Sequence, residues 1–189
     1  MPNTTDTTDA AITAEPTTST TTIGAQPHEG QTRIAIFVDG SCLGNPGLGG
    51  WGVVIMREDA LGQVIKRRER SGYEVNETTN NRMEMTAACV ALESLGSVTD
   101  EPIILYCDAL NIPNTMNREL AKWKAKGWKR GNYAPVKNRD LWERLERAAQ
   151  GRRVTWEWVR GHNGTKHNER AHKLAKSASR RAEEIVMGR

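Results

Sequence analysis

An uninterrupted apolar run over residues 34–38 ends in a carboxylate, Asp39, and this run most constrains the fold. Its side chains alternate between two faces, and because both faces are apolar the run is typical of a buried central strand. The glycines and the proline among residues 40–47 predict a turn-rich loop directly after Asp39. An Asp-Gly pair also forms simple turns, so the run alone indicates either a functional site or an ordinary turn.

Two further carboxylates follow at positions that can bring them toward Asp39. A helix that begins at Thr79, a good N-cap residue, turns Glu84 toward the apolar stripe that should face a sheet. Residues 102–108 predict a second buried strand that ends in Asp108, and the strand–helix–strand order makes it parallel to its neighbour. Three clustered carboxylates repel one another unless metal ions neutralise them, whereas a structural salt bridge is the alternative for Glu84. The adjacency of Asp39 and Asp108 rests on analogy with open α/β sheets.

The other segments complete a mixed α/β pattern. Short connections favour an antiparallel meander for the first three strands. In chain order we expect strands over residues 50–56 and 63–73, a basic stretch over 118–139, a helix over 140–149, a strand over 154–159 and a helix over 166–186.

Charge is distributed unevenly along the chain. Residues 1–32 are rich in Thr and contain four acidic side chains but no Lys or Arg, which predicts a disordered tail. Residues 33–189 carry 27 basic and 19 acidic side chains and are expected to form one folded domain. A basic domain behind an acidic tail indicates a polyanionic partner, with a merely solubilising surface as the alternative.

The cysteines and the hydropathy pattern indicate the compartment. Cys42, Cys89 and Cys107 are odd in number and widely spaced, which favours free thiols in a reducing environment. No apolar run approaches the length of a membrane span, and the N-terminus lacks the pattern of a secretory signal. We therefore expect a cytoplasmic protein without membrane association.

Two other segments carry candidate chemistry. The basic stretch over residues 118–139 interleaves cations with Trp123, Trp128 and Tyr133, a pattern suited to phosphates and stacked bases. The alternative is a solvated helix whose tryptophans lie in the core. His162 lies in a glycine-flanked loop and would be able to shuttle protons near neutral pH, although an exposed loop histidine is the simpler interpretation.

Several of these motifs together resemble one known family. They are Asp39-Gly-Ser-Cys-x-Gly-Asn45-Pro, Thr79-Asn-Asn-Arg-Met-Glu84, Asp108, Trp156-x-Trp-Val-x-Gly-His162 and Asn168-Glu-Arg, in this order. Over roughly residues 33–180 the chain resembles bacterial-type ribonuclease HI. The resemblance implies a ribonuclease H-like α/β fold, a five-stranded mixed sheet in the order 3-2-1-4-5 flanked by helices. It also implies a monomeric endonuclease that uses two Mg²⁺ ions to hydrolyse the RNA strand of RNA–DNA hybrids, leaving 3′-hydroxyl and 5′-phosphate ends.

The resemblance also implies a role for each matching residue. Asp39 would bridge both metal ions, Glu84 and Asp108 would hold the second ion, and His162 would act in catalysis. The residues expected to bind nucleic acid form three groups. They are Asn45, Asn80 and Asn81 in the hybrid minor groove; Thr79, the Asn80 backbone and Asn138 on a DNA phosphate; and Trp123, Lys124, Lys126 and Lys129 in a basic protrusion on the DNA strand.

The chain departs from the family pattern at its fourth metal-ligating carboxylate, a position that His172 occupies. Imidazole is a neutral, softer ligand that Mn²⁺ tolerates better than Mg²⁺, so we expect His172 to act as a ligand and to favour Mn²⁺. Ala109 and Leu110 replace the polar pair usual after Asp108, and Pro113 would shorten the next helix. These departures leave two alternatives open, a hybrid-binding domain that does not cut, and, more weakly, another nuclease or integrase of this fold.

Overall fold

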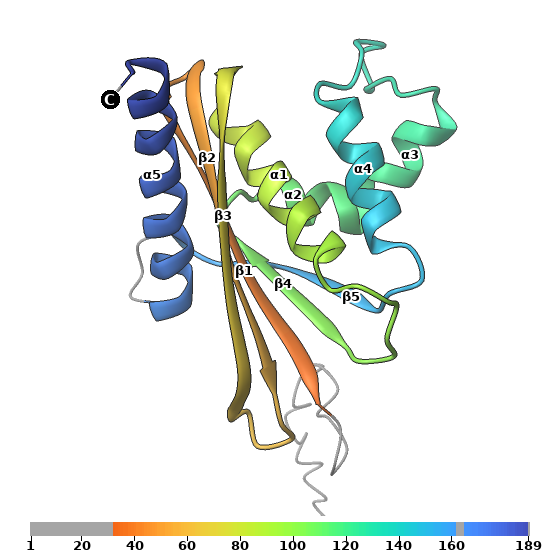
Figure 1. The fold of residues 1–189 in the computed structure, drawn as a ribbon. Helices are drawn as coiled ribbons and strands as arrows, with labels where there is room; N and C mark the ends of the chain where they lie inside the picture. The colour runs from red at the N-terminus through yellow and green to blue at the C-terminus, as the bar shows by residue number, and fades with distance from the viewer. Residues whose placement is uncertain (1–31, 162–164, 189) are drawn as a thin grey trace, which may run out of the picture.

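A five-stranded mixed sheet in the order β3-β2-β1-β4-β5 lies between two layers of helices (Figure 1). The structure is a computed structural model that describes residues 32–161 and 165–188. Its strands are β1 (Arg33–Gly44), β2 (Gly47–Glu58), β3 (Val64–Thr78), β4 (Ile103–Cys107) and β5 (Val154–Trp158). Its helices are α1 (Asn80–Glu93), α2 (Asn111–Asn114), the π-helix η1 (Thr115–Glu119), α3 (Leu120–Ala125), α4 (Arg139–Ala149) and α5 (Lys166–Val186). The fold class and strand order predicted from the resemblance are confirmed.

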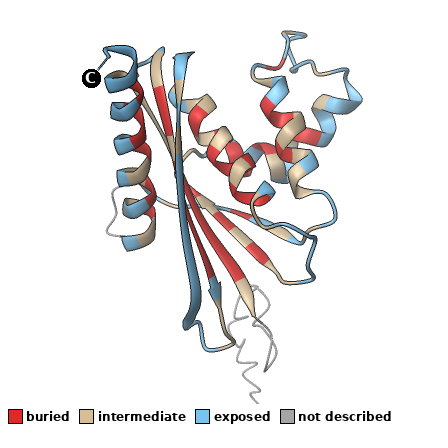
Figure 2. Cartoon of the chain, in the orientation of Figure 1, coloured by how far each residue is buried: buried red, intermediate tan, exposed pale blue. Residues whose placement is uncertain are grey.

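Strand β1 lies at the centre of the sheet, antiparallel to β2 and parallel to β4. Residues 34–38 are buried on both faces, as their apolar character predicts (Figure 2). The expected turn-rich loop directly after Asp39 is wrong, because β1 continues to Gly44 and stays paired with β2. Only Asn45 and Pro46 separate the two strands. Gly50 of β2 allows close packing against a helix, since a Cβ at Gly50 would lie 2.3 Å from the Ser179 nitrogen of α5.

Helix α5 covers one face of the sheet, and α1 covers the other with α4 packed on its outer side (Figure 1). Small side chains of α5 let it lie close to β2, and Ala171, Ala175 and Ala182 are fully buried. The opposite layer joins Met85 and Leu92 of α1 to α4 in one apolar core. Placed this way, α1 brings its buried stripe against β1 just where that strand carries Asp39.

The chain between β4 and α4 is more helical than the sequence predicts. Helices α2, η1 and α3 follow one another without a break, and Pro113 is buried within the single turn of α2. Trp123 packs edge-on against Trp142 with ring centroids 5.9 Å apart, so its ring partly belongs to the core. Trp128 is also partly buried against the core. A core position for the tryptophans is the alternative interpretation of the basic stretch.

The structure gives the state of the cysteines and the character of the helices. All three cysteines, Cys42, Cys89 and Cys107, are free thiols. Within the described part of the chain, no helix combines the length and apolar character needed to cross a bilayer. Residues 1–31 of the expected tail lie outside the described residues, whereas Thr32 donates a hydrogen bond to Glu101.

Candidate active site

Three carboxylates converge where β1, β4 and α1 meet. One oxygen from each of Asp39, Glu84 and Asp108 lies within 4.8 Å of the other two. Asp39 stands in β1 just beyond its pairing with β4, and Asp108 directly follows β4. Because the two strands are parallel and their pairing ends at Val38 and Cys107, the next residues, Asp39 and Asp108, lie beside one another. Glu84 reaches the same point from the second turn of α1, as its position on the apolar stripe predicts.

A glycine beside Asp39 allows α1 to come this close. A Cβ on Gly40 would lie 2.3 Å from the backbone nitrogen of Glu84 and 2.7 Å from the carbonyl carbon of Met83. The helix start is fixed as well, because the Thr79 side chain accepts a hydrogen bond from the Arg82 nitrogen at 3.3 Å. The backbone contact at Gly40 therefore sets the distance between Glu84 and Asp39.

Strand β5 and the chain that follows it support Asp108. The Trp158 indole Nε1 donates a hydrogen bond to the Asp108 carbonyl oxygen at 3.1 Å. A Cβ at Gly161 would lie 2.8 Å from Asp108 Oδ2, so only glycine leaves that carboxylate its present position. Neither contact was predicted from the sequence, although Trp158 and Gly161 both belong to the Trp-x-Trp-Val-x-Gly-His motif.

Burial and mutual repulsion disfavour charge on these acids. Burial, the Asp108 charge and a weaker opposing hydrogen bond from Gly40 together raise the pKa of Asp39 to about 8. Burial, then the charges of Asp39 and Asp108, raises the pKa of Glu84 to about 9. Glu84 Oε2 is also buried without a hydrogen-bond partner. Hard oxygen ligands in this state fit a divalent cation, which would restore their charged form and satisfy the orphaned oxygen.

His172 contacts this cluster through Asp39. Its Nδ1 lies 3.1 Å from Asp39 Oδ2, and about a third of its side chain is exposed (34%). No lysine or arginine within residues 32–161 and 165–188 forms an ion pair with the three carboxylates. The imidazole therefore lies beside the acid that is expected to bridge two ions. His162, the expected proton shuttle, lies outside the described residues.

Most residues expected to contact nucleic acid line one cavity of about 740 Å³. The expected residues in its wall are Asn45, Thr79, Asn81, Trp123 and Asn138. The backbone nitrogen of Asn80 donates to Asn45 Oδ1 at 3.3 Å, which fixes the wall where α1 begins. The wall also contains Arg130 and Lys137 of the predicted basic stretch. Its remaining residues were not predicted from the sequence, and they are Asn111, Asn114, Thr115 and Trp142.

The three lysines expected beside Trp123 do not line this cavity. Lys124 forms an ion pair with Glu146 at 2.6 Å and lines a separate cavity of about 460 Å³. Lys126 caps the C-terminus of α3, and Lys129 is exposed and pairs with Pro135 in an isolated β-bridge. The cavity receives its positive charge from Arg130 and Lys137 instead.

The strand order and the cluster of Asp39, Glu84 and Asp108 together define a ribonuclease H-like fold with a candidate metal-dependent site. The family model for RNase H matches residues 31–180. A Ribonuclease H of Alcanivorax borkumensis is 45% identical over 142 residues, covering 75% of this chain and 88% of the relative. A Ribonuclease H of Cereibacter sphaeroides is 45% identical over 141 residues, covering 75% of this chain and 91% of the relative. The chain belongs to the RNase H family, a family of endoribonucleases.

Two solved RNase H1 structures are also similar to this chain. LC9-RNase H1, described as a type 1 RNase H with the type 2 active-site motif, is 32% identical with a TM-score of 0.71. The match covers 82% of this chain and 76% of that one. LC11-RNase H1, solved in complex with RNA/DNA hybrid, is 28% identical with a TM-score of 0.58, covering 80% and 99% of the two chains.

Proposed function

We propose that this protein is an endonuclease that hydrolyses the RNA strand of RNA–DNA hybrids and leaves 3′-hydroxyl and 5′-phosphate ends. The observation that carries the proposal is the carboxylate cluster, in which three acids converge within 4.8 Å and one buried oxygen of Glu84 has no hydrogen-bond donor. The hybrid complex of the similar LC11-RNase H1 supports the choice of substrate. We further propose that the protein acts as a cytoplasmic monomer.

In this proposal the acids hold two divalent ions, Mg²⁺ or Mn²⁺. Asp39, Glu84 and Asp108 would hold these ions, and Asp39 would be the ligand shared by both. When bound, the ions activate the attacking water and stabilise the leaving 3′-oxygen. His162 moves the proton during the reaction, because an imidazole titrates near neutral pH.

The cavity of about 740 Å³ described above would hold the hybrid. Side-chain amides of Asn45 and Asn81 offer donors to the acceptor-rich minor groove and to RNA 2′-hydroxyls. Thr79, the Asn80 backbone and Asn138 would bind a phosphate of the DNA strand. Trp123 lies on the same wall, whereas Lys124, Lys126 and Lys129 would contact the DNA strand only outside this cavity.

His172 is proposed as a ligand of the ion that activates water. Replacing an acid by imidazole removes one negative charge and one hard oxygen from the site, which weakens Mg²⁺ more than Mn²⁺. We therefore expect His172→Asp to raise cleavage in Mg²⁺ by about tenfold and to lower the Mn²⁺-to-Mg²⁺ rate ratio. The measurement is the initial rate on a labelled hybrid in each metal.

The matched control is Lys173→Gln, which removes one positive charge from the exposed neighbour of His172 on α5. This variant should leave the rate ratio unchanged. Equal Mg²⁺ activity in wild type and His172→Asp would contradict the proposed ligand role. Binding of hybrid without cutting in either metal, by both proteins, would contradict the nuclease function itself.

A further inference from the structure

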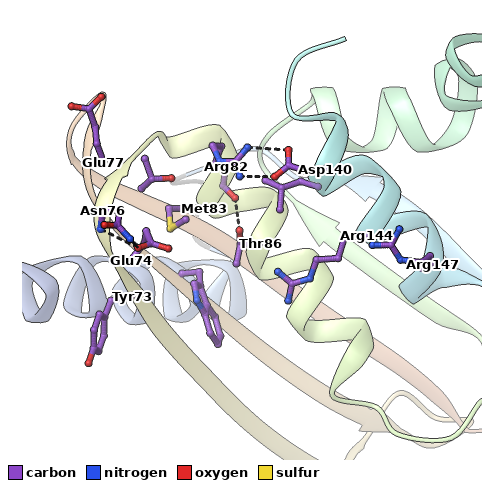
Figure 3. Close-up of a pocket in the computed structure, with 13 residues that line it drawn as sticks. Tyr73, Glu74, Asn76, Glu77, Arg82, Met83, Thr86, Asp140, Arg144 and Arg147 are labelled. Carbon is purple, nitrogen blue, oxygen red and sulfur yellow. Dashed lines mark hydrogen bonds and ion pairs between the residues drawn. The ribbon is translucent and has the colours of Figure 1, made fainter. Parts of the chain in front are cut away.

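A chain of hydrogen bonds runs from an ion pair at the start of α4 to the side-chain amide of Asn81 on α1. Arg82 Nη1 and Nη2 donate to the two carboxylate oxygens of Asp140 at 3.1 and 2.7 Å (Figure 3). The same Nη1 donates to Asn138 Oδ1 at 3.2 Å, and Asn138 Nδ2 donates to Asn81 Oδ1 at 2.9 Å. Four side chains of two helices thus form one connected network.

Each hydrogen bond of this network has a defined donor and acceptor, because Arg82 can only donate. A guanidinium has five N–H donors and no acceptor, so Asn138 must turn its oxygen toward Arg82 and its NH₂ toward Asn81. Asn81 must then present its oxygen to Asn138. The Asn81 NH₂ makes no hydrogen bond to another described residue, so the network leaves that donor group for the cavity that Asn81 lines.

The backbone at Asn138 does not supply this orientation. Asn138 has the left-handed conformation with φ of 57° and is the N-cap of α4, yet its side chain makes no capping hydrogen bond. Its amide is instead engaged on both sides by Arg82 and Asn81. Loss of Arg82 would therefore free the Asn138 amide to reverse, and Asn81 could reverse with it.

We propose that Arg82, held by Asp140, is a positioning residue that fixes the polarity of the Asn138 and Asn81 amides for hybrid binding. The inference rests on the proposed function. A nucleic acid presents acceptors at its phosphates and its minor groove, so a donor-presenting Asn81 binds it and a reversed Asn81 does not. The ion pair itself contributes little stability, because Asp140 is largely exposed (60%).

The test compares Arg82→Lys with a matched control, Arg144→Lys. Arg144 joins the same two helices through a two-point ion pair with Glu93, at 2.8 Å for both contacts, and touches neither amide. The two arginines are equally exposed, at 36% and 35%, and both line the cavity of Figure 3. A lysine keeps the charge at either position but cannot donate to Asp140 and Asn138 in the fork geometry.

Hybrid binding is measured by fluorescence anisotropy in Ca²⁺, and KM and kcat are measured in Mg²⁺ and Mn²⁺. We expect Arg82→Lys to raise Kd and KM roughly five- to tenfold with kcat within about twofold, and Arg144→Lys to change neither constant. Equal effects of the two variants, or no effect of Arg82→Lys, would overturn the proposal. Both melting temperatures are recorded, because a stability loss alone would affect the two variants alike.

Asp140→Asn distinguishes a positioning role of Arg82 from direct contact with a phosphate, because the two roles predict opposite changes in Kd. If Arg82 bound a phosphate directly, removing the neighbouring negative charge would tighten hybrid binding. Positioning predicts the opposite, because the fork that holds Arg82 is lost and Kd should rise about threefold or more. Tighter binding by Asp140→Asn would overturn the proposal. Wild-type binding without cleavage would count against the nuclease function and leave this comparison of Kd values intact.

Discussion

Gly40→Ala is expected to destabilise the protein by about 3 kcal/mol or more and to lower hybrid cleavage at least tenfold in whatever protein folds. The new Cβ would lie 2.3 Å from the Glu84 nitrogen, 2.7 Å from the Met83 carbonyl carbon and 2.9 Å from the Asn80 oxygen. All three are backbone atoms, so no side chain can move aside to make room. Helix α1 has to shift away from β1, and Glu84 leaves Asp39 as it does so.

The measurements are urea denaturation and the cleavage rate of the same preparation. Gly131→Ala is the control, because a Cβ at Gly131 would meet nothing within 4 Å. It should change the free energy of unfolding by less than about 0.5 kcal/mol. If Gly40→Ala kept the stability of the wild type, the proposed dependence of the carboxylate cluster on this backbone contact would be wrong.

Asp39→Asn is expected to abolish cleavage, by at least about a thousandfold, while stabilising the metal-free protein. The acid that both ions would share is lost, so activity falls. The amide is nearly isosteric but carries no charge, so it removes both the cost of burying a carboxylate at this position and its repulsion from the Asp108 charge. Sites of this kind commonly sacrifice stability for function.

The stability gain should depend on pH in a defined direction. The pKa of Asp39 is about 4 when unfolded and about 8 in the folded protein, so the folded state binds more protons between these values. Without metal, the free energy of unfolding of the wild type therefore falls as the pH rises from about 4 to about 8. Glu84 contributes in the same direction up to about pH 9.

The measurement is a series of thermal melts in chelator, at pH 5.5 and at pH 8. Asp39→Asn should melt several degrees above the wild type at pH 8, for a gain on the order of 2 kcal/mol, and the gap should narrow at pH 5.5. Added Mg²⁺ or Mn²⁺ should stabilise the wild type more than the variant. A variant that melts below the wild type at pH 8 in chelator would show that the carboxylate of Asp39 is stabilised rather than strained.

Sequence periodicity sufficed for the parts of the site that depend on local structure. The 3.6-residue period of a helix predicted that Glu84 faces the sheet, and the apolar runs that end in Asp39 and Asp108 indicated two buried strands. The resemblance, rather than the pattern of side chains, supplied the strand order. The adjacency of Asp39 and Asp108 could only be borrowed by analogy, because strand pairing between distant segments leaves no local signal.

The contacts that refine the site could not be read from the sequence. Gly40 resembled a loop glycine, since no local pattern shows that the backbone of Glu84, 44 residues further along the chain, packs against it. The hydrogen bond from Asn138 to Asn81 joins residues 57 apart, and the role of Arg82 depends on it. The division of the basic stretch between two cavities likewise follows from how α3 and α4 pack, which charge spacing does not encode.

The most direct test of the account is cleavage of an RNA–DNA hybrid whose two strands carry different labels, in Mg²⁺ and separately in Mn²⁺. The wild type is expected to cut the RNA strand internally, to leave the DNA strand intact and to produce 3′-hydroxyl and 5′-phosphate ends. Asp39→Asn should produce no cuts in either metal. Tight binding of the hybrid by the wild type with no cutting in either metal would contradict the account, and would make the domain a hybrid-binding module.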